Sequence, residues 1–175
     1  MKQFDALQKE YPELYKYCHK AEEYMKEDPE SSLLKAGKAL EYMVKTLEKN
    51  QLEPVVWIHE HRNDCINELA QHGTIDEDFA SELLKLRILC SDALDDRNEK
   101  EPTVEDAEKG MALLSSLVGR FIHTMETLGN MRKTGKTTPK PMGVNRKKAA
   151  KAGKLLALGG VIAAAALTVI FGSKE

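Results

Sequence analysis

The feature that most constrains the fold of this chain is an uninterrupted apolar run close to its end. Residues 155–172 read LLALGGVIAAAALTVIFG, eighteen residues without a charge and with Thr168 as the only polar side chain. About 20 helical residues cross the roughly 30 Å hydrocarbon core of a bilayer. Apolar residues cover every face of the run, so a helix here would offer no polar stripe to water. We therefore expect a membrane-spanning helix over residues 154–172.

The expected anchor has a hydrocarbon part and a surface part. A buried or interfacial helix is the alternative, because four alanines and Gly159–Gly160 lower the mean hydropathy. The side chains expected at the headgroups, where long cations extend toward the lipid, are Arg146, Lys147, Lys148, Lys151 and Lys154. The side chains expected in hydrocarbon are Leu155, Leu156, Leu158, Val161, Ile162, Leu167, Val169, Ile170 and Phe171.

Charge is distributed very unevenly along the chain. Residues 1–131 carry 16 Lys/Arg and 27 Asp/Glu, which leaves a formal charge of −11, whereas residues 132–154 carry nine Lys/Arg and no acid. Nucleic acid is an unfavourable partner for so acidic a region, because its phosphates require clustered cations. The basic stretch instead suits anionic lipids. We expect the lipid bilayer to be the first partner of this chain.

The basic flank also predicts an orientation. Positively charged flanks stay on the cytoplasmic side, so the large N-terminal part is expected to face the cytoplasm from a single-pass anchor, with a bacterial inner membrane as the expected setting. Cys18, Cys65 and Cys90 are odd in number and widely spaced, which is typical of reduced thiols. The first residues lack the apolar stretch of a signal peptide.

The sequence pattern of the first 130 residues predicts an all-α bundle of about five helices. Apolar residues recur every three or four positions, and strand-like alternation is absent. Pro12, Asp28–Pro29, Asp76 and the Thr103–Asp106 capping box mark expected helix starts, and Gly73 and Gly129–Asn130 mark expected ends. The expected helices are residues 12–27, 29–49, 55–73, 76–96 and 103–128. We assign residues 1–130 to this bundle and residues 131–153 to a basic, flexible tether.

Three segments together resemble a known family. They are YPELYKY (residues 11–17), AEEYMKEDPESSLLKAGKALEYMVK (residues 21–45) and IDEDFASELLKLRILCSDALDD (residues 75–96). The chain is similar, over roughly residues 4–125, to domain of unknown function 4145, a helical family grouped with the HEPN-like bundles and found alone in bacteria or fused to restriction and other defence proteins. The resemblance implies a helical bundle in a bacterial or phage defence or stress system.

The resemblance also implies a site. HEPN-type ribonucleases dimerise so that a polar helix face, with an Arg or Asn followed closely by His, meets its symmetry mate and cleaves RNA without metal. Here Arg87 matches the arginine, Cys90–Ser91 stands at a Gly-Asn pair, and Asp95 stands at the histidine. Gly37 stands where the first motif often has Arg. If any residues were catalytic they would be Arg87, Ser91 and Asp95, and the implied dimer or partner face is Arg87, Ser91, Asp92 and Asp95.

Asp95 argues against catalysis. Cleavage of RNA without a metal needs a group that exchanges protons near pH 7, which His does at its unperturbed pKa. An ionised aspartate, with Asp92 and Asp96 beside it, would repel phosphate. We expect the bundle to act by association, as a homodimer or with a protein partner. A ribonuclease with a degenerate site is one alternative, and a membrane-permeabilising effector acting through the C-terminal helix is another.

No metal or cofactor is expected. His61 and Cys65 are spaced as i and i+4, but two ligands do not make a zinc site, and helical surface residues explain them better. Asp92, Asp95, Asp96 and Glu99 are better explained as a solvated helix end than as a cation site.

Overall fold

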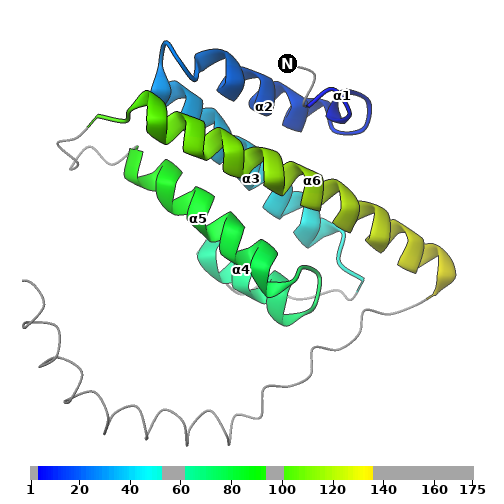
Figure 1. Cartoon of the computed structure of the whole chain (residues 1–175). Coiled ribbons are helices and arrows are strands. Elements are labelled where there is room, and N and C mark those ends of the chain that lie inside the picture. Colours follow the sequence, from blue (N-terminus) through cyan, green and yellow to red (C-terminus); the bar gives the residue numbers. More distant parts are fainter. Residues whose placement is uncertain (1–3, 53–61, 94–100, 136–175) are drawn as a thin grey trace, which may run out of the picture. The chain divides into compact units, whose positions relative to one another are not determined.

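The computed structural model describes residues 4–52, 62–93 and 101–135, and these form an all-α bundle without strands. Six helices lie in these stretches (Figure 1). They are α1 (Leu7–Glu10), α2 (Pro12–Tyr24), α3 (Pro29–Lys49), α4 (Arg62–Gln71), α5 (Glu77–Ala93) and α6 (Val104–Thr134). The predicted all-α fold is confirmed for this part of the chain.

Most helix starts follow the predicted capping chemistry. Asp28 Oδ1 accepts the Ser31 N–H at 2.9 Å, and Pro29 occupies the first helical position of α3. Thr103 and Asp106 form a reciprocal capping box at the start of α6. Gly73 follows the C-terminal end of α4 and has φ 69°, a left-handed conformation that glycine adopts without strain.

Helix α3 is the centre of the bundle, because α2, α4, α5 and α6 all pack against it. The N-terminal parts of α3 and α6 meet at Leu33 and Gly110, and their C-terminal ends meet where Arg132 donates to Asn50 Oδ1 at 3.0 Å. These two helices are therefore parallel. Helices α2 and α5 run antiparallel to α3 and do not contact each other. In Figure 1, α6 crosses the bundle between α2 and α5.

The core is almost entirely apolar. Phe79 and Phe121 are its largest buried side chains, and Ser32 is one of only two buried polar residues among those described. Ser32 Oγ donates to the Ala21 carbonyl at 2.7 Å. This carbonyl belongs to the last turn of α2, where backbone acceptors have no intrahelical partner. The bond therefore satisfies a helix end and joins α2 to α3.

The predicted end of the last bundle helix is wrong. Helix α6 does not stop at Gly129–Asn130 but continues to Thr134, and Gly135 ends it with φ 66°. A glycine inside a helix costs only about 1 kcal/mol, which buried Leu128 and the Arg132 bond to Asn50 offset. Residues 131–134, predicted as the start of the tether, are therefore helical. The count of about five helices also missed α1, whose four residues are too few to show a periodic pattern.

Several predictions fall outside the described residues. These include the helix start at residue 55, the C-terminal turn around Asp95 and Asp96, and everything from residue 136 onward. None of the helices within the described stretches combines the length and apolarity needed to cross a membrane. The expected span over residues 154–172 lies beyond those stretches.

Candidate interaction surface on helix α5

Three of the residues that the resemblance implies, Arg87, Ser91 and Asp92, lie on α5, and the outward side of this helix has an exposed apolar residue at its centre. Its inward side is formed by buried Phe79, Leu83, Leu86 and Cys90. At 100° per residue, Ile88 lies opposite this stripe, and its side chain is 59% exposed. Exposed Ser81, Lys85, Ser91 and Asp92 surround it, and these five residues are called the α5 face below.

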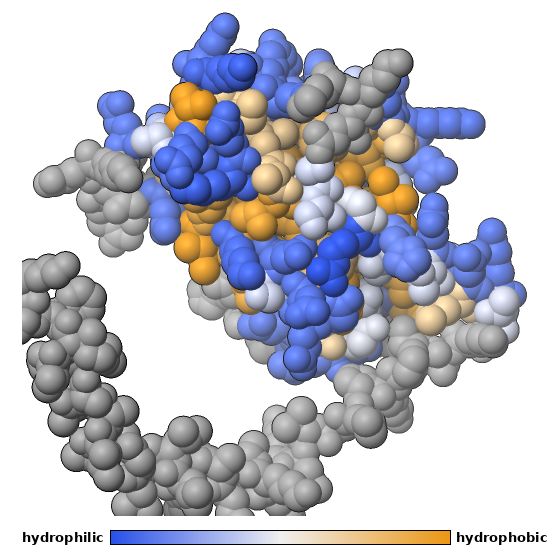
Figure 2. All heavy atoms as spheres, in the orientation of Figure 1, coloured by the Kyte–Doolittle hydropathy of each residue, from blue (hydrophilic) through white to orange (hydrophobic). Residues whose placement is uncertain are grey.

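Exposed large apolar side chains are rare on this bundle. Among the described residues, only Ile88 and Val104, which is 40% exposed, belong to this class. Figure 2 shows hydrophilic residues over much of the face seen in Figure 1, with apolar residues visible between them. A single exposed apolar residue is normal on a protein surface, and protein interfaces combine an apolar centre with a polar rim of the kind seen around Ile88.

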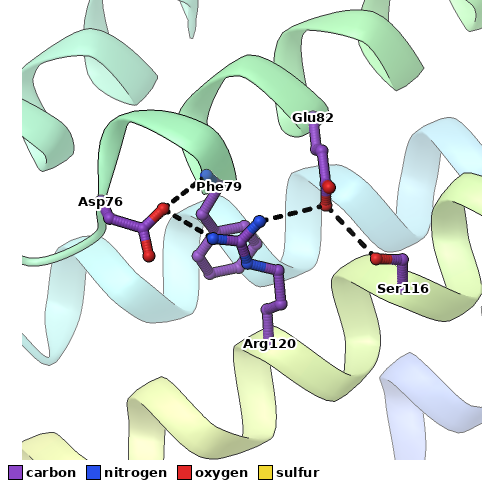
Figure 3. Close-up of polar contacts among 5 residues, drawn as sticks. All are labelled: Asp76, Phe79, Glu82, Ser116 and Arg120. Atoms are coloured by element: carbon purple, nitrogen blue, oxygen red, sulfur yellow. Dashed lines mark hydrogen bonds and ion pairs between the residues drawn. The ribbon is translucent and has the colours of Figure 1, made fainter.

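A polar cluster fixes the start of α5 against α6. Arg120 of α6 contacts Asp76 Oδ1 at 2.6 Å and Glu82 Oε2 at 3.4 Å, and its guanidinium carbon lies 5.1 Å from the centre of the Phe79 ring (Figure 3). Ser116 Oγ donates to the same Glu82 oxygen at 3.3 Å. We call this set the Arg120 cluster. It joins the start of α5 to a side chain of α6 that lies 44 positions further along the chain, and so limits rotation of α5.

The Arg120 cluster changes the acidity of Asp76. Partial burial alone would raise the pKa of this carboxyl, but the hydrogen bond from the Phe79 amide and the contact with Arg120 outweigh it, so the pKa is lowered. Asp76 Oδ1 accepts the Phe79 N–H at 2.7 Å. The ionised carboxylate is thus the form that caps α5 and holds Arg120.

Two glycines lie at helix contacts around the other half of α5. A Cβ on Gly37 of α3 would lie 3.5 Å from Cys90 Cβ, an ordinary contact. A Cβ on Gly110 of α6 would lie 2.7 Å from Leu33 Cδ2 and 3.6 Å from Leu89 Cδ2. The missing side chain of Gly110 lets α3 and α6 approach each other, whereas position 37 has room for a Cβ. The position where the resemblance expects an arginine, Gly37, is thus at a helix contact.

Beside the α5 face lies a groove of about 250 Å³. Its apolar lining comes from Leu33, Leu89, Ala93 and Pro102, and its acidic lining from Asp92, Glu101 and Asp106. Asp106 is also part of the α6 capping box. The groove places apolar surface next to Asp92.

The structure places the predicted site residues as follows. Arg87 and Ser91 are one turn apart on the same side of α5; Arg87 is half-buried and already makes a contact, and Ser91 is exposed. Asp92 is exposed and also makes a contact. Asp95, the position of the expected histidine, lies outside the described residues, as do residues 146–171, which are expected at the membrane. The triad Arg87, Ser91 and Asp95 therefore stays a prediction.

The cysteines show no sign of reactivity. Burial raises the pKa of Cys18 and Cys90 to about 12, and burial together with the hydrogen bond that the Cys65 thiol donates to Glu48 raises the pKa of Cys65 to about 11. These groups are thiols at neutral pH, whereas nucleophiles and metal ligands need the thiolate. Within the described stretches, no three His, Cys, Asp or Glu side chains are grouped to hold a metal ion. His61 is outside them.

Two features of this region, exposed Ile88 and the Arg120 cluster, were not predicted from the sequence. A helical-wheel projection of residues 77–93 places Ile88 opposite Phe79 and Cys90, and this signal was sufficient to find it. The Arg120 cluster had no local signal in the sequence, because Arg120 and Asp76 are separated by 44 positions.

Comparison with known proteins adds no relative: no family model, curated protein or solved structure matches the chain.

Proposed function

We propose that this protein is a membrane-tethered helical domain that faces the cytoplasm and acts by self-association through the α5 face, without catalysis. One observation carries the association: Ile88, 59% exposed, is centred on a helix whose orientation is held by the Arg120 cluster. The tether is supported by the sequence alone, through nine Lys/Arg in residues 132–154 and the apolar run that follows.

The charges of the α5 face favour a second copy as the partner. Most soluble homo-oligomers use two-fold interfaces in which one patch meets itself. If two α5 helices cross antiparallel about Ile88, Lys85 of one copy meets Asp92 of the other, because the two residues lie at nearly equal distances on either side of Ile88. Lys85 and Asp92 are seven positions apart in one helix, about 10 Å, so they do not neutralise each other within one chain.

Self-association through the α5 face is weak and needs the proposed membrane tether. Burying the remaining exposed part of one isoleucine contributes only about 1 kcal/mol per copy, and an exposed ion pair adds less than about 1 kcal/mol. Such an interface is weak in dilute solution. Confinement near a bilayer raises the effective concentration of the second copy. Weak association therefore becomes effective only where many copies share a membrane.

The alternatives rest on the sequence alone. Kinship with the HEPN-like families, a role in a defence or stress system, a ribonuclease built on Arg87, Ser91 and Asp95, and a permeabilising C-terminal helix all stay predictions. A carboxylate at Asp95 is a poor proton carrier at neutral pH, and fold resemblance by itself does not transfer an activity. Association needs none of these assumptions.

Energy transfer between donor- and acceptor-labelled full-length copies in vesicles tests the association. We expect Ile88→Asp to weaken it at least tenfold, and Val104→Asp, the matched change at the other exposed apolar residue, to leave it within twofold. Lys85→Asp and Asp92→Lys should each weaken it, and the double variant should restore it. Wild-type transfer no higher than that of Ile88→Asp would contradict the proposal.

Alkaline carbonate extraction tests the tether separately. The full-length protein should stay in the membrane pellet, and a variant lacking residues 155–172 should appear in the wash. Release of the full-length protein into the wash would refute the anchor while leaving the association experiment to be judged independently.

A further inference from the structure

A groove between α2 and α3 is lined by more cations than acids, although residues 1–131 as a whole are acidic. It measures about 370 Å³ and is lined by Glu13, Tyr17, Lys38, Glu41, Tyr42, Lys45, Thr46 and Lys49. Three cations and two acids therefore line a groove in a region, residues 1–131, whose formal charge is −11. A groove in which cations outnumber acids attracts anions.

The three lysines form a single stripe. Lys38, Lys45 and Lys49 are separated by two turns and then one turn of α3, so their side chains project along about 16 Å of one helix side. All three are exposed. None forms a salt bridge with any carboxylate in the described part of the chain. Their charges are therefore available to an external anion.

The remaining lining suits a membrane surface. Tyr17 and Tyr42 are half-buried, and the Tyr17 hydroxyl donates to Glu13 Oε1 at 3.1 Å. Tyrosine has an apolar ring and a polar tip, and it is enriched with lysine where proteins meet lipid headgroups. The carboxylates of Glu13 and Glu41 keep their charge, and the three lysines of the lining outnumber them.

From these observations we infer that the α2–α3 groove binds the phosphate headgroups of anionic lipids and lays this side of the bundle on the leaflet. The inference rests on the proposed tether, which keeps the bundle within reach of the bilayer. Helices α2 and α5 pack on α3 without touching each other. Headgroup binding at the groove therefore leaves the α5 face open to a second copy.

Photo-crosslinking of the full-length protein in bilayer nanodiscs tests the inference. The probe is phosphatidylglycerol with a photoreactive headgroup, and crosslinked peptides are identified by mass spectrometry. We expect crosslinks to peptides covering residues 12–24 and 35–49. Each lysine near an anionic leaflet is worth about fivefold in occupancy. Partial contact of three lysines should therefore make the yield roughly tenfold higher than with an equally photoreactive phosphatidylcholine.

A matched pair of triple variants separates this groove from general charge. Lys38→Gln, Lys45→Gln and Lys49→Gln together should lower the crosslinking of these peptides about tenfold. Lys9→Gln, Lys16→Gln and Lys109→Gln together remove the same charge from exposed positions outside the groove and should change it less than twofold. Equal yields for the two triple variants, or for the two lipids, would overturn the inference.

Crosslinks to the C-terminal segment identify failures of the tether in the same experiment. A crosslinked C-terminal segment with an unlabelled groove refutes the groove alone. A labelled groove with an unlabelled C-terminal segment supports the groove and contradicts the anchor. If neither is labelled, both are refuted, because the groove then does not meet the leaflet.

Discussion

Arg120 Nη2 lies 2.6 Å from Asp76 Oδ1, the same oxygen that accepts the N–H of Phe79 in the first turn of α5. One carboxylate thus caps α5 and binds a side chain of α6. The orientation of the α5 face depends on this shared atom, because rotating α5 would break the cap and the ion pair together. The association proposed for Ile88 therefore depends on a cluster near the opposite end of the same helix.

Removing the Arg120 charge should destabilise the bundle modestly. Arg120→Met keeps most of the aliphatic stem and removes the contacts with Asp76, Glu82 and the Phe79 ring. Exposed ion pairs contribute up to about 1 kcal/mol, and a cation over an aromatic ring about 0.5–1 kcal/mol. We expect the free energy of unfolding to fall by about 1–1.5 kcal/mol in urea titrations of the full-length protein in mild detergent. Lys133→Met, which removes an exposed cation of the same helix, should change it by less than about 0.5 kcal/mol.

The lowered pKa of Asp76 predicts how its contribution varies with pH. Because the folded pKa lies below the ordinary value of 3.8, the ionised form stabilises the fold above that value. Asp76→Asn keeps a capping oxygen but loses the charge. At pH 7 we expect this variant to be less stable by about 0.5–1 kcal/mol, a small figure because the Asp76 side chain is 67% exposed.

Acid should remove that difference. As the pH falls below 3.8 and through the folded pKa, Asp76 becomes protonated in the wild type, and the gap between wild type and Asp76→Asn should close. Unfolding free energies measured between pH 7 and pH 2.5 test this, with Glu77→Gln as the neighbouring control. A gap that stays constant to pH 2.5 would show that the charge of Asp76 is not involved.

Two identical substitutions in α6 should have different effects. Gly119 is open to space, so Gly119→Ala should stabilise the protein by about 0.5–1 kcal/mol through helix propensity. The same change at Gly110 places a Cβ 2.7 Å from Leu33 Cδ2, and Leu33 is buried. Displacing a packed side chain costs about 1–3 kcal/mol. Gly110→Ala should therefore be at least about 1 kcal/mol less stable than Gly119→Ala in the same urea titration, and equal stability would mean that Leu33 moves freely.

Ser32 should contribute more to the free energy of unfolding than an exposed serine does. Ser32→Ala removes the bond to the Ala21 carbonyl and leaves that buried acceptor without its partner. Such a loss costs about 1–2 kcal/mol. Ser81→Ala on the exposed side of α5 is the control and should lie within about 0.5 kcal/mol of the wild type. Circular dichroism during urea unfolding compares the two, and similar values would argue against a structural role for Ser32.

Local chemistry explains which parts of the fold could be predicted. The starts of α3, α5 and α6 depend on Asp28, Asp76 and Thr103, whose partners lie three residues further along the chain. Such signals are visible in sequence because the donor and the acceptor lie within one turn. The buried side of each helix could also be predicted, because apolar residues recur there every three or four positions.

The features that escaped prediction depend on contacts between distant segments. The extension of α6 past Gly129 is supported by Arg132, which reaches Asn50 82 positions earlier. The Arg120 cluster likewise joins α6 to the start of α5. The lysine stripe on α3 becomes a groove only when α2 places Glu13 and Tyr17 beside it. Residue spacing along one helix cannot reveal which other helix lies opposite.

Cysteine crosslinking at position 88 in native membranes tests the central claim most directly. In a two-fold contact centred on Ile88, the two copies of this position face each other, within reach of a disulfide. In a Cys65→Ser background, full-length Ile88→Cys should form a disulfide-linked dimer on mild oxidation. Glu108→Cys, an exposed α6 position in the same background, should remain largely monomeric. Equal dimer yields at positions 88 and 108 would contradict association through the α5 face.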